Sequence, residues 1–224
     1  GQAILNDMTL LGVGAALGGV SGTSTTLGGI GTGYIYPAWK GQIAYTTPNM
    51  NGFQATIAIT NPNQGQLGVA TATTTATNAV ELYQDRFGVE GQAIYSWTGD
   101  VSGKVWASGA TYDVEAQSSA RSAAVTSATT DSYTASAWDI GINVNAGNLG
   151  LTAYYYETDG VGATMFGGLF ANSGVDVQSA TSIKTRDGDG GYLQATYVIP
   201  TGTKLGLAYG RSNLDRASGE TSAQ

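Results

Sequence analysis

Two charged residues, Lys40 and Asp139, stand in stretches where apolar and polar residues alternate. Alternation gives a strand one apolar and one polar face, and a lipid-facing strand tolerates a charge only on the face that points to water. Both residues are therefore candidates for a water-lined surface that filters solutes by charge. The alternative for Lys40 is a position above the membrane, at the outer end of its strand. The amide residues Gln42, Gln54, Asn143 and Gln194 occupy the polar positions of their own alternating stretches and are candidates for the same water-lined surface.

Asp7 is the only charged residue before Lys40. A carboxylate placed opposite cationic wall residues sets a transverse field across a water-filled constriction and selects solutes by charge and dipole. We therefore expect Asp7 to be the acidic member of such a constriction. Its alternative role is a turn residue or a helix cap.

Catalytic and metal-binding chemistry has few candidates in this chain. The absence of Cys and His removes thiol catalysis, histidine acid–base catalysis and nearly all zinc sites. The run Arg-Asp-Gly-Asp-Gly at 186–190 has the alternating carboxylates of a calcium loop but lacks its distal Glu, which favours a solvated loop tip. The sequence shows no pair of acidic residues and no Ser/acid arrangement that would indicate a hydrolase. The sequence predicts no enzyme, no cofactor and no metal site.

Eight alternating runs, arranged in four pairs, must position these residues. A turn of a few residues joins the two members of each pair, and polar stretches at 61–90, 113–133 and 157–190 separate the pairs. Short turns on one side and long loops on the other predict a transmembrane β-barrel. Within 104–112 the facing is ambiguous, and we expect the side that carries Val105 to point outward. The eight runs are 39–47, 52–60, 91–97, 104–112, 138–145, 149–156, 192–199 and 205–209.

The composition agrees with a membrane-exposed surface. Charged residues make up only 11% of the chain, against about 25% in soluble domains. No segment approaches the roughly 20 apolar residues of a spanning helix. The net charge of -7, with nine scattered basic residues, argues against a nucleic-acid partner. Aromatic residues near strand ends predict an interfacial girdle, namely Tyr45, Trp97, Trp138, Tyr155, Tyr197 and Tyr209.

Several of these segments resemble the trimeric general diffusion porins of the Gram-negative outer membrane. The resemblance rests on 3–14, on 42–48 followed by 51–56, and on 191–197 with 205–210, in an order and spacing that extend over essentially the whole chain. It implies an all-β, antiparallel transmembrane barrel of about 16 strands. This chain would hold about eight of them, the sixth to the thirteenth, as an internal portion of a longer protein.

The resemblance also implies how the chain is divided and assembled. Residues 1–224 form a single, partial barrel domain, in which 1–33 are a constriction loop folded into the pore and 34–224 are barrel strands and extracellular loops. The implied partners are outer-membrane lipid, small hydrophilic solutes and ions, and two further copies in a homotrimer. No cofactor is implied.

The expected function is passive diffusion of small hydrophilic solutes and ions, with charge filtering at the loop constriction. The excess of carboxylates over basic residues, 16 against 9, favours cations if those carboxylates reach the pore. The alternative is a structural barrel that houses or anchors a partner protein, such as an electron-transfer cytochrome, and conducts no solute.

Overall fold

The computed structural model describes residues 41–61, 69–71, 79–83, 86–118, 131–161, 175–179 and 182–216. The expectations for Asp7, for Lys40 and for the constriction loop at 1–33 fall outside these ranges. In the part of the chain that is described, no helix has the length and apolar character needed to cross a membrane.

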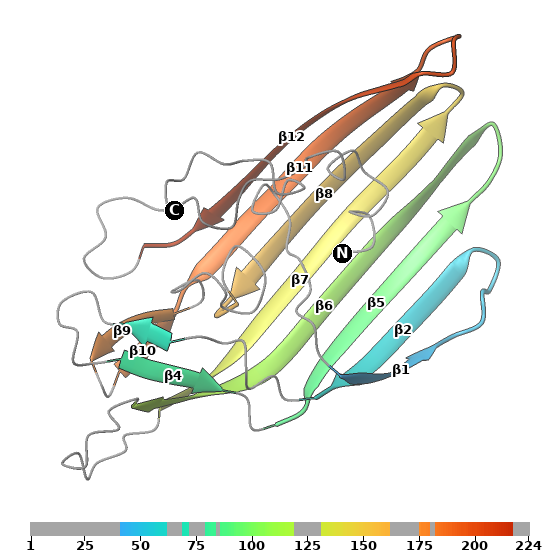
Figure 1. Ribbon diagram of the computed structural model, residues 1–224. Helices are drawn as coiled ribbons and strands as arrows, with labels where there is room; N and C mark the ends of the chain where they lie inside the picture. The colour runs from blue at the N-terminus through green and yellow to red at the C-terminus, as the bar shows by residue number, and fades with distance from the viewer. Residues whose placement is uncertain are drawn as a thin grey trace.

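The main body is an antiparallel sheet in which eight strands follow one another as neighbours (Figure 1). The short β3 (Val69–Thr71) and β4 (Ala79–Tyr83) extend this sheet at the far end of β6, and β9 (Val175–Ser179) pairs with β10 (Ser182–Thr185) in a separate ribbon. The predicted all-β, antiparallel architecture is confirmed. The eight neighbours, in order, are β1 (Gln42–Thr46), β2 (Phe53–Thr60), β5 (Gly88–Trp97), β6 (Val101–Ser118), β7 (Asp131–Ala146), β8 (Leu149–Asp159), β11 (Asp187–Val198) and β12 (Lys204–Leu214).

Each of the eight predicted runs overlaps one of these strands, but several strands are longer than the apolar alternation. β6 continues to Ser118 and β7 begins at Asp131, so both reach into the predicted loop at 113–133. The run 186–190 is not a loop tip, because β11 begins at Asp187 and pairs with β8 on one side and β12 on the other. The two neighbouring strands provide hydrogen-bond partners for the backbone N–H and C=O groups of this polar segment. The segment can therefore form a strand without an apolar face.

Four short turns connect β1 to β2, β5 to β6, β7 to β8 and β11 to β12, and all lie at one end of the sheet (Figure 1). In the first turn, Asn51 and Gly52 have positive φ angles of 53° and 96°. The Asn49 Oδ1 accepts a hydrogen bond of 2.8 Å from the Gly52 N–H. Both residue types tolerate left-handed backbone, so the sequence fixes the tight turn. The strand ends that the longer connections join lie at the opposite end.

The two faces of the sheet differ in burial. We call the face that carries the apolar side chains of β1, β2, β7, β8, β11 and β12 the exposed face, because Ile43 is 84% and Leu207 79% exposed. The opposite, buried face carries Trp106, which is 4% exposed, and Tyr156, which is fully buried. A sheet in water would turn its apolar side inward, so the arrangement indicates a solvent other than water on the exposed face.

Candidate functional site

Four of the predicted water-facing residues lie on the buried face. Gln54, Asp139, Asn143 and Gln194 share the inward phase of their strands with Trp106, as the cross-strand register shows. Gln42 pairs with Thr60, which is buried, so it belongs to the same face at the edge strand β1. Lys40 and Asp7 lie outside the described residues. The expected facing of β6 is confirmed, because Val105 pairs with Ile142 on the exposed face.

Asp139 is the best-defined charged group on this face. It stands opposite Ser108 of β6 and Tyr156 of β8. The Ser108 hydroxyl donates a hydrogen bond of 2.5 Å to Asp139 Oδ2. The other oxygen, Oδ1, is buried and has no hydrogen-bond partner among the described residues. Asp139 therefore retains one acceptor that the neighbouring strands leave unused.

Lys104 is a charged member of this face that the sequence analysis missed. We expected a strand to begin at Lys104, but β6 begins at Val101, and Lys104 pairs with Ser96 and Asn143 on the buried face. Its Nζ lies 5.7 Å from the centroid of the Trp106 ring, within the range of a cation–π contact. The sequence contained this information, because Lys104 and Trp106 are two residues apart and therefore point to the same face of a strand.

Aromatic rings form a cluster on the buried face that composition alone did not indicate. Trp106 stacks with Tyr154 at 6.4 Å between ring centroids, and Tyr154 lies 5.5 Å from Tyr192 and 6.2 Å from Tyr156. Strand positions 141 and 190, opposite these rings, are glycines, and a Cβ at either would overlap the ring of Trp106 or Tyr156. The glycines thus let the rings lie against the sheet.

The exposed face carries an apolar band that crosses the sheet obliquely. Its boundary toward the long connections is Trp138 on β7, Tyr155 on β8 and Tyr209 on β12, beyond which the outward residues become polar, whereas next to β5 both Val89 and Phe87 are exposed. Following the cross-strand pairs from Val89 through β6 and β7 leads to Asp159 on β8, which lies beyond the band's boundary at Tyr155. The position of the band along the strands therefore shifts from β5 to β12. Strands tilted against a flat lipid layer require this drift.

Aromatic side chains occur at the band's margins, as predicted. Trp138 and Tyr155 lie with ring centroids 5.7 Å apart, and Tyr95 stacks with Trp97 at 6.2 Å. All six predicted girdle residues share the outward phase of their strands. Amphipathic rings in these positions suit the boundary between lipid tails and headgroups.

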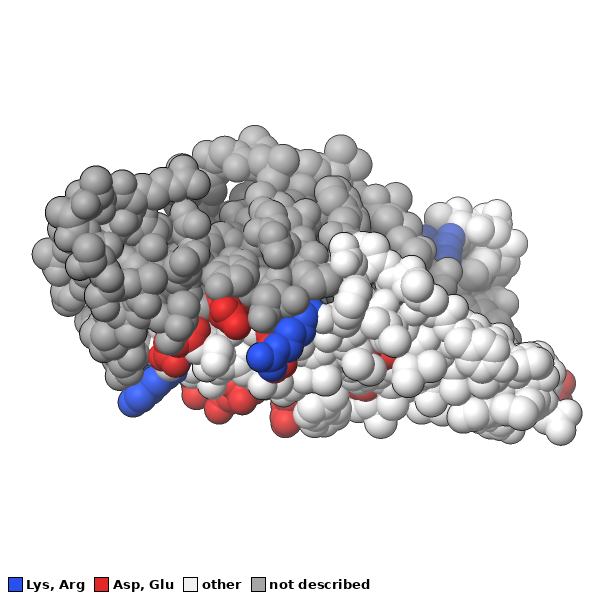
Figure 2. All heavy atoms as spheres, turned by 90° about the horizontal axis from the view of Figure 1, so that it is seen from below, with Lys and Arg blue, Asp and Glu red and all other residues white. Residues whose placement is uncertain are grey.

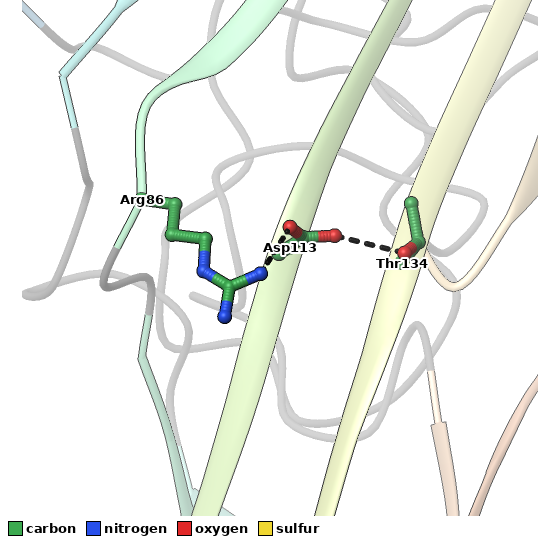
Figure 3. A network of polar contacts seen from close by, with 3 residues as sticks. All are labelled: Arg86, Asp113 and Thr134. Atoms are coloured by element: carbon green, nitrogen blue, oxygen red, sulfur yellow. Dashed lines mark hydrogen bonds and ion pairs between the residues drawn. The ribbon is translucent and has the colours of Figure 1, made fainter.

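Beyond the band, charged and polar side chains occupy the exposed face near the long connections. Figure 2 shows acidic side chains gathered toward one end of the described surface, while most of the remainder in that view is uncharged. Arg86 forms an ion pair of 3.3 Å with Asp113, which also accepts a 2.8 Å hydrogen bond from Thr134 (Figure 3). This network extends across neighbouring strands outside the apolar band.

In the same region, carboxylate residues of β8 and β11 stand directly opposite one another. Asp187 stands opposite Asp159, and Asp189 stands opposite Glu157. Desolvation, followed by the charges of Asp159, Asp215 and Glu157, raises the pKa of Asp187. These carboxylates lie on the exposed face, so they do not contribute charge to the buried one.

Comparisons with known proteins agree with this geometry. The model of the Gram-negative porin family matches residues 2–224. The chain is similar in structure to the outer membrane channel DcaP of Acinetobacter baumannii, with a TM-score of 0.59 and 16% sequence identity. The match covers 83% of this chain and 46% of that one, so the chain spans less than half of that channel's length. A search of curated proteins found no match. Because the family model extends over nearly the whole sequence, the chain belongs to the Gram-negative porins and is a protein of the outer membrane.

Proposed function

We propose that this chain forms part of a channel for passive diffusion of small hydrophilic solutes and ions through a water-filled pore. The observation that carries the proposal is the opposite chemistry of the two faces within single strands. On β7, Ile142 is exposed beside Tyr95 and Val105, while the next residue, Asn143, points to the other face and donates a 2.8 Å hydrogen bond to Thr152. A lipid-facing band backed by a polar face is the arrangement of a barrel with an aqueous lumen.

Charge filtering in this channel would depend on the few ionic side chains of the buried face. Lys104, Asp139 and Glu90 share that face, Glu90 through its pairing with Ala58, which is buried. Charged groups lining a narrow aqueous path select ions by sign. We retain Asp7 and Lys40 as candidates for the constriction, which residues 1–33 would form, and Gln42 as a wall residue.

The geometry revises the expected basis of ion preference. The cation preference rested on the carboxylate excess, but Glu157, Asp159, Asp187 and Asp189 lie on the exposed face. On the buried face, the described charges include one cation, Lys104, and two carboxylates, Asp139 and Glu90. We therefore propose a pore with weak ion selectivity, in which single substitutions of Lys104 and Asp139 shift the preference in opposite directions.

Conductance in a planar lipid bilayer tests the proposal. The purified protein should give stepwise, ohmic openings in concentrated salt, and openings grouped in threes would support the homotrimer that we propose. In a salt gradient, Lys104→Gln should move the reversal potential toward cation preference and Asp139→Asn toward anion preference. Arg211→Gln, in the outward phase of β12, is the matched control. Silent membranes despite verified insertion would contradict a diffusion channel and favour a structural barrel.

A further inference from the structure

The ribbon formed by β9 and β10 is attached to the main sheet at few points. Its two strands pair with each other, and the described residues show no backbone ladder between the ribbon and the main sheet. Figure 1 shows the ribbon at the end of the sheet opposite the four short turns. A two-stranded ribbon is at best marginally stable by itself in water. The position of the ribbon therefore depends on the contacts that hold it.

One end of the ribbon is fixed where the chain continues into β11. Arg186, between β10 and β11, is 2% exposed, and its Nε donates a hydrogen bond of 2.6 Å to the backbone oxygen of Asp215. The Arg186 carbonyl accepts a 3.2 Å hydrogen bond from the N–H of Gly160. Arg186 thus connects the chain to the ends of β8 and β12. Any movement of the ribbon would pivot at this residue.

Asp131, the first residue of β7, holds the ribbon at a second point. Its Oδ2 accepts a hydrogen bond of 3.0 Å from the backbone N–H of Ile183 on β10, and its Oδ1 accepts one of 2.9 Å from the N–H of Ser132. β10 lies against β7 along this contact, and β9 lies against β3. The carboxylate of Asp131 therefore connects the ribbon to the first turn of chain in β7.

This contact lies on the side of β7 that carries the buried face. Asp131 and Tyr133 share the inward phase of β7 with Ala135, which is fully buried. The Tyr133 ring and the Thr185 side chain lie 2.9 Å and 3.1 Å from the point that a Cβ on Gly160 would occupy. The ribbon therefore meets β7 on its inner side. In a barrel, a segment in this position narrows the path through the lumen.

We propose that the β9–β10 ribbon is a strap at the channel mouth and that the Asp131 carboxylate is its latch, an inference that rests on the proposed diffusion function. While the hydrogen bond to Ile183 is made, the strap stays on the inner side of β7 and narrows the mouth. When the bond breaks, the strap pivots at Arg186 and the mouth widens. Segments held by few contacts open in this way without unfolding of the whole protein. Asp131 is a positioning residue, because it acts through the ribbon.

Cleavage by trypsin measures the opening of the strap independently of any current. Lys184 on β10 is exposed, but a protease cuts a paired strand only after local opening, at a rate that follows the open population. Loss of one hydrogen bond should raise that population about threefold to tenfold. We expect Asp131→Ala in detergent micelles to be cut after Lys184 faster by this factor, measured from fragment masses. Asp131→Asn keeps an acceptor oxygen for the Ile183 N–H and should restore most of the protection.

Single-channel current tests the effect of the strap on the mouth. Brief upward steps above the main conductance should be about threefold to tenfold more frequent in Asp131→Ala than in the natural protein, in proportion to the open population. Asp113→Ala is the matched control, because it removes a carboxylate of the neighbouring strand β6 that is paired with Arg86 on the exposed face. It should change neither the cleavage after Lys184 nor the upward steps.

The outcomes separate the strap from the channel function. Equal cleavage after Lys184 in Asp131→Ala and Asp113→Ala would overturn the latch. Faster cleavage of Asp131→Ala without more frequent upward steps would overturn the control of the mouth. Membranes that stay silent with every variant would overturn the diffusion function and the control of the mouth together, whereas the cleavage rates would still decide whether Asp131 holds the ribbon.

Discussion

The indole ring of Trp106 on β6 lies across Gly141 on β7, in a space that any larger residue at position 141 would occupy. Because the ring lies flat on the neighbouring strand, it reaches Tyr154 on the next strand, with 6.4 Å between centroids. The opposite face has a counterpart, in which Trp97 lies across Gly103. A tryptophan ring lying over a cross-strand glycine thus occurs on both faces of the sheet.

Adding one methyl group at position 141 should disturb this contact. Gly141→Ala places a Cβ in the Trp106 ring, and overpacking of this kind costs typically about 1 to 3 kcal/mol. We expect a lower midpoint of urea unfolding in lipid vesicles and altered tryptophan emission. Gly91→Ala is the control, because its nearest contact would be an ordinary 3.8 Å to Thr56. Equal losses in both variants would show that the ring does not lie where the structure places it.

Neighbouring residues on β7 should respond oppositely to a charge. Ile142→Arg puts a guanidinium on the apolar band, where an Arg near the midplane costs about 2 to 4 kcal/mol. Asn143→Arg puts the same group on the polar face and should cost less. Folding yield in vesicles of a single lipid composition measures the difference. If Asn143→Arg were the more damaging of the two, the assignment of faces would be reversed.

The raised pKa of Asp187 predicts how its contribution depends on pH. Since the folded state favours the protonated carboxyl, its stabilising contribution is present at low pH and is lost as the pH rises through the raised pKa. Asp187→Asn, which mimics the protonated form, should therefore be more stable than the natural protein at neutral pH, with the gap closing on acidification. Asp187→Glu keeps the charge and should show no such convergence. If the difference in stability between Asp187→Asn and the natural protein stayed constant with pH, the ionisation of Asp187 would be ruled out as its cause.

The ion pair between Arg86 and Asp113 should contribute little. Its side chains are 67% and 40% exposed, and exposed pairs are worth about 0 to 1 kcal/mol. A double-mutant cycle with Arg86→Gln and Asp113→Asn should give a coupling free energy below about 1 kcal/mol that falls with added salt. A larger, salt-insensitive coupling would mean that the pair is shielded from water in the membrane.

The alternation of residue types predicted the eight neighbouring strands of the sheet, but not the short β3, β4, β9 and β10, which lie in the stretches 61–90 and 157–190 that were predicted to be loops. Ile142 and Asn143 alternate so clearly that they fix the orientation of β7, and pairing with β7 then settles the ambiguous facing of Val105. The strand ends were less predictable. The residues that open β11 are Asp and Gly, which propensity assigns to turns, yet β8 and β12 on either side supply their hydrogen bonds.

The aromatic cluster could not be predicted, because it depends on register. Tyr154, Tyr156 and Tyr192 lie on the polar phase of their strands, where sequence reasoning expects contact with water. Their partners Gly141 and Gly190 come from other strands, and only the pairing brings them opposite the rings. The inward position of Lys104 was missed because the start of β6 was placed too late, although its alternation with Trp106 was visible in the sequence.

We propose that the face carrying Asn143 lines an aqueous pore while the face carrying Ile142 meets lipid. The chain contains no cysteine, so single substitutions give unambiguous labelling sites. The decisive measurement is the current through Asn143→Cys and Ile142→Cys channels before and after a charged, membrane-impermeant thiol reagent is added. We expect the reagent to change the current through Asn143→Cys and to leave Ile142→Cys unaffected. A change only in Ile142→Cys, or in neither variant, would contradict the proposed pore.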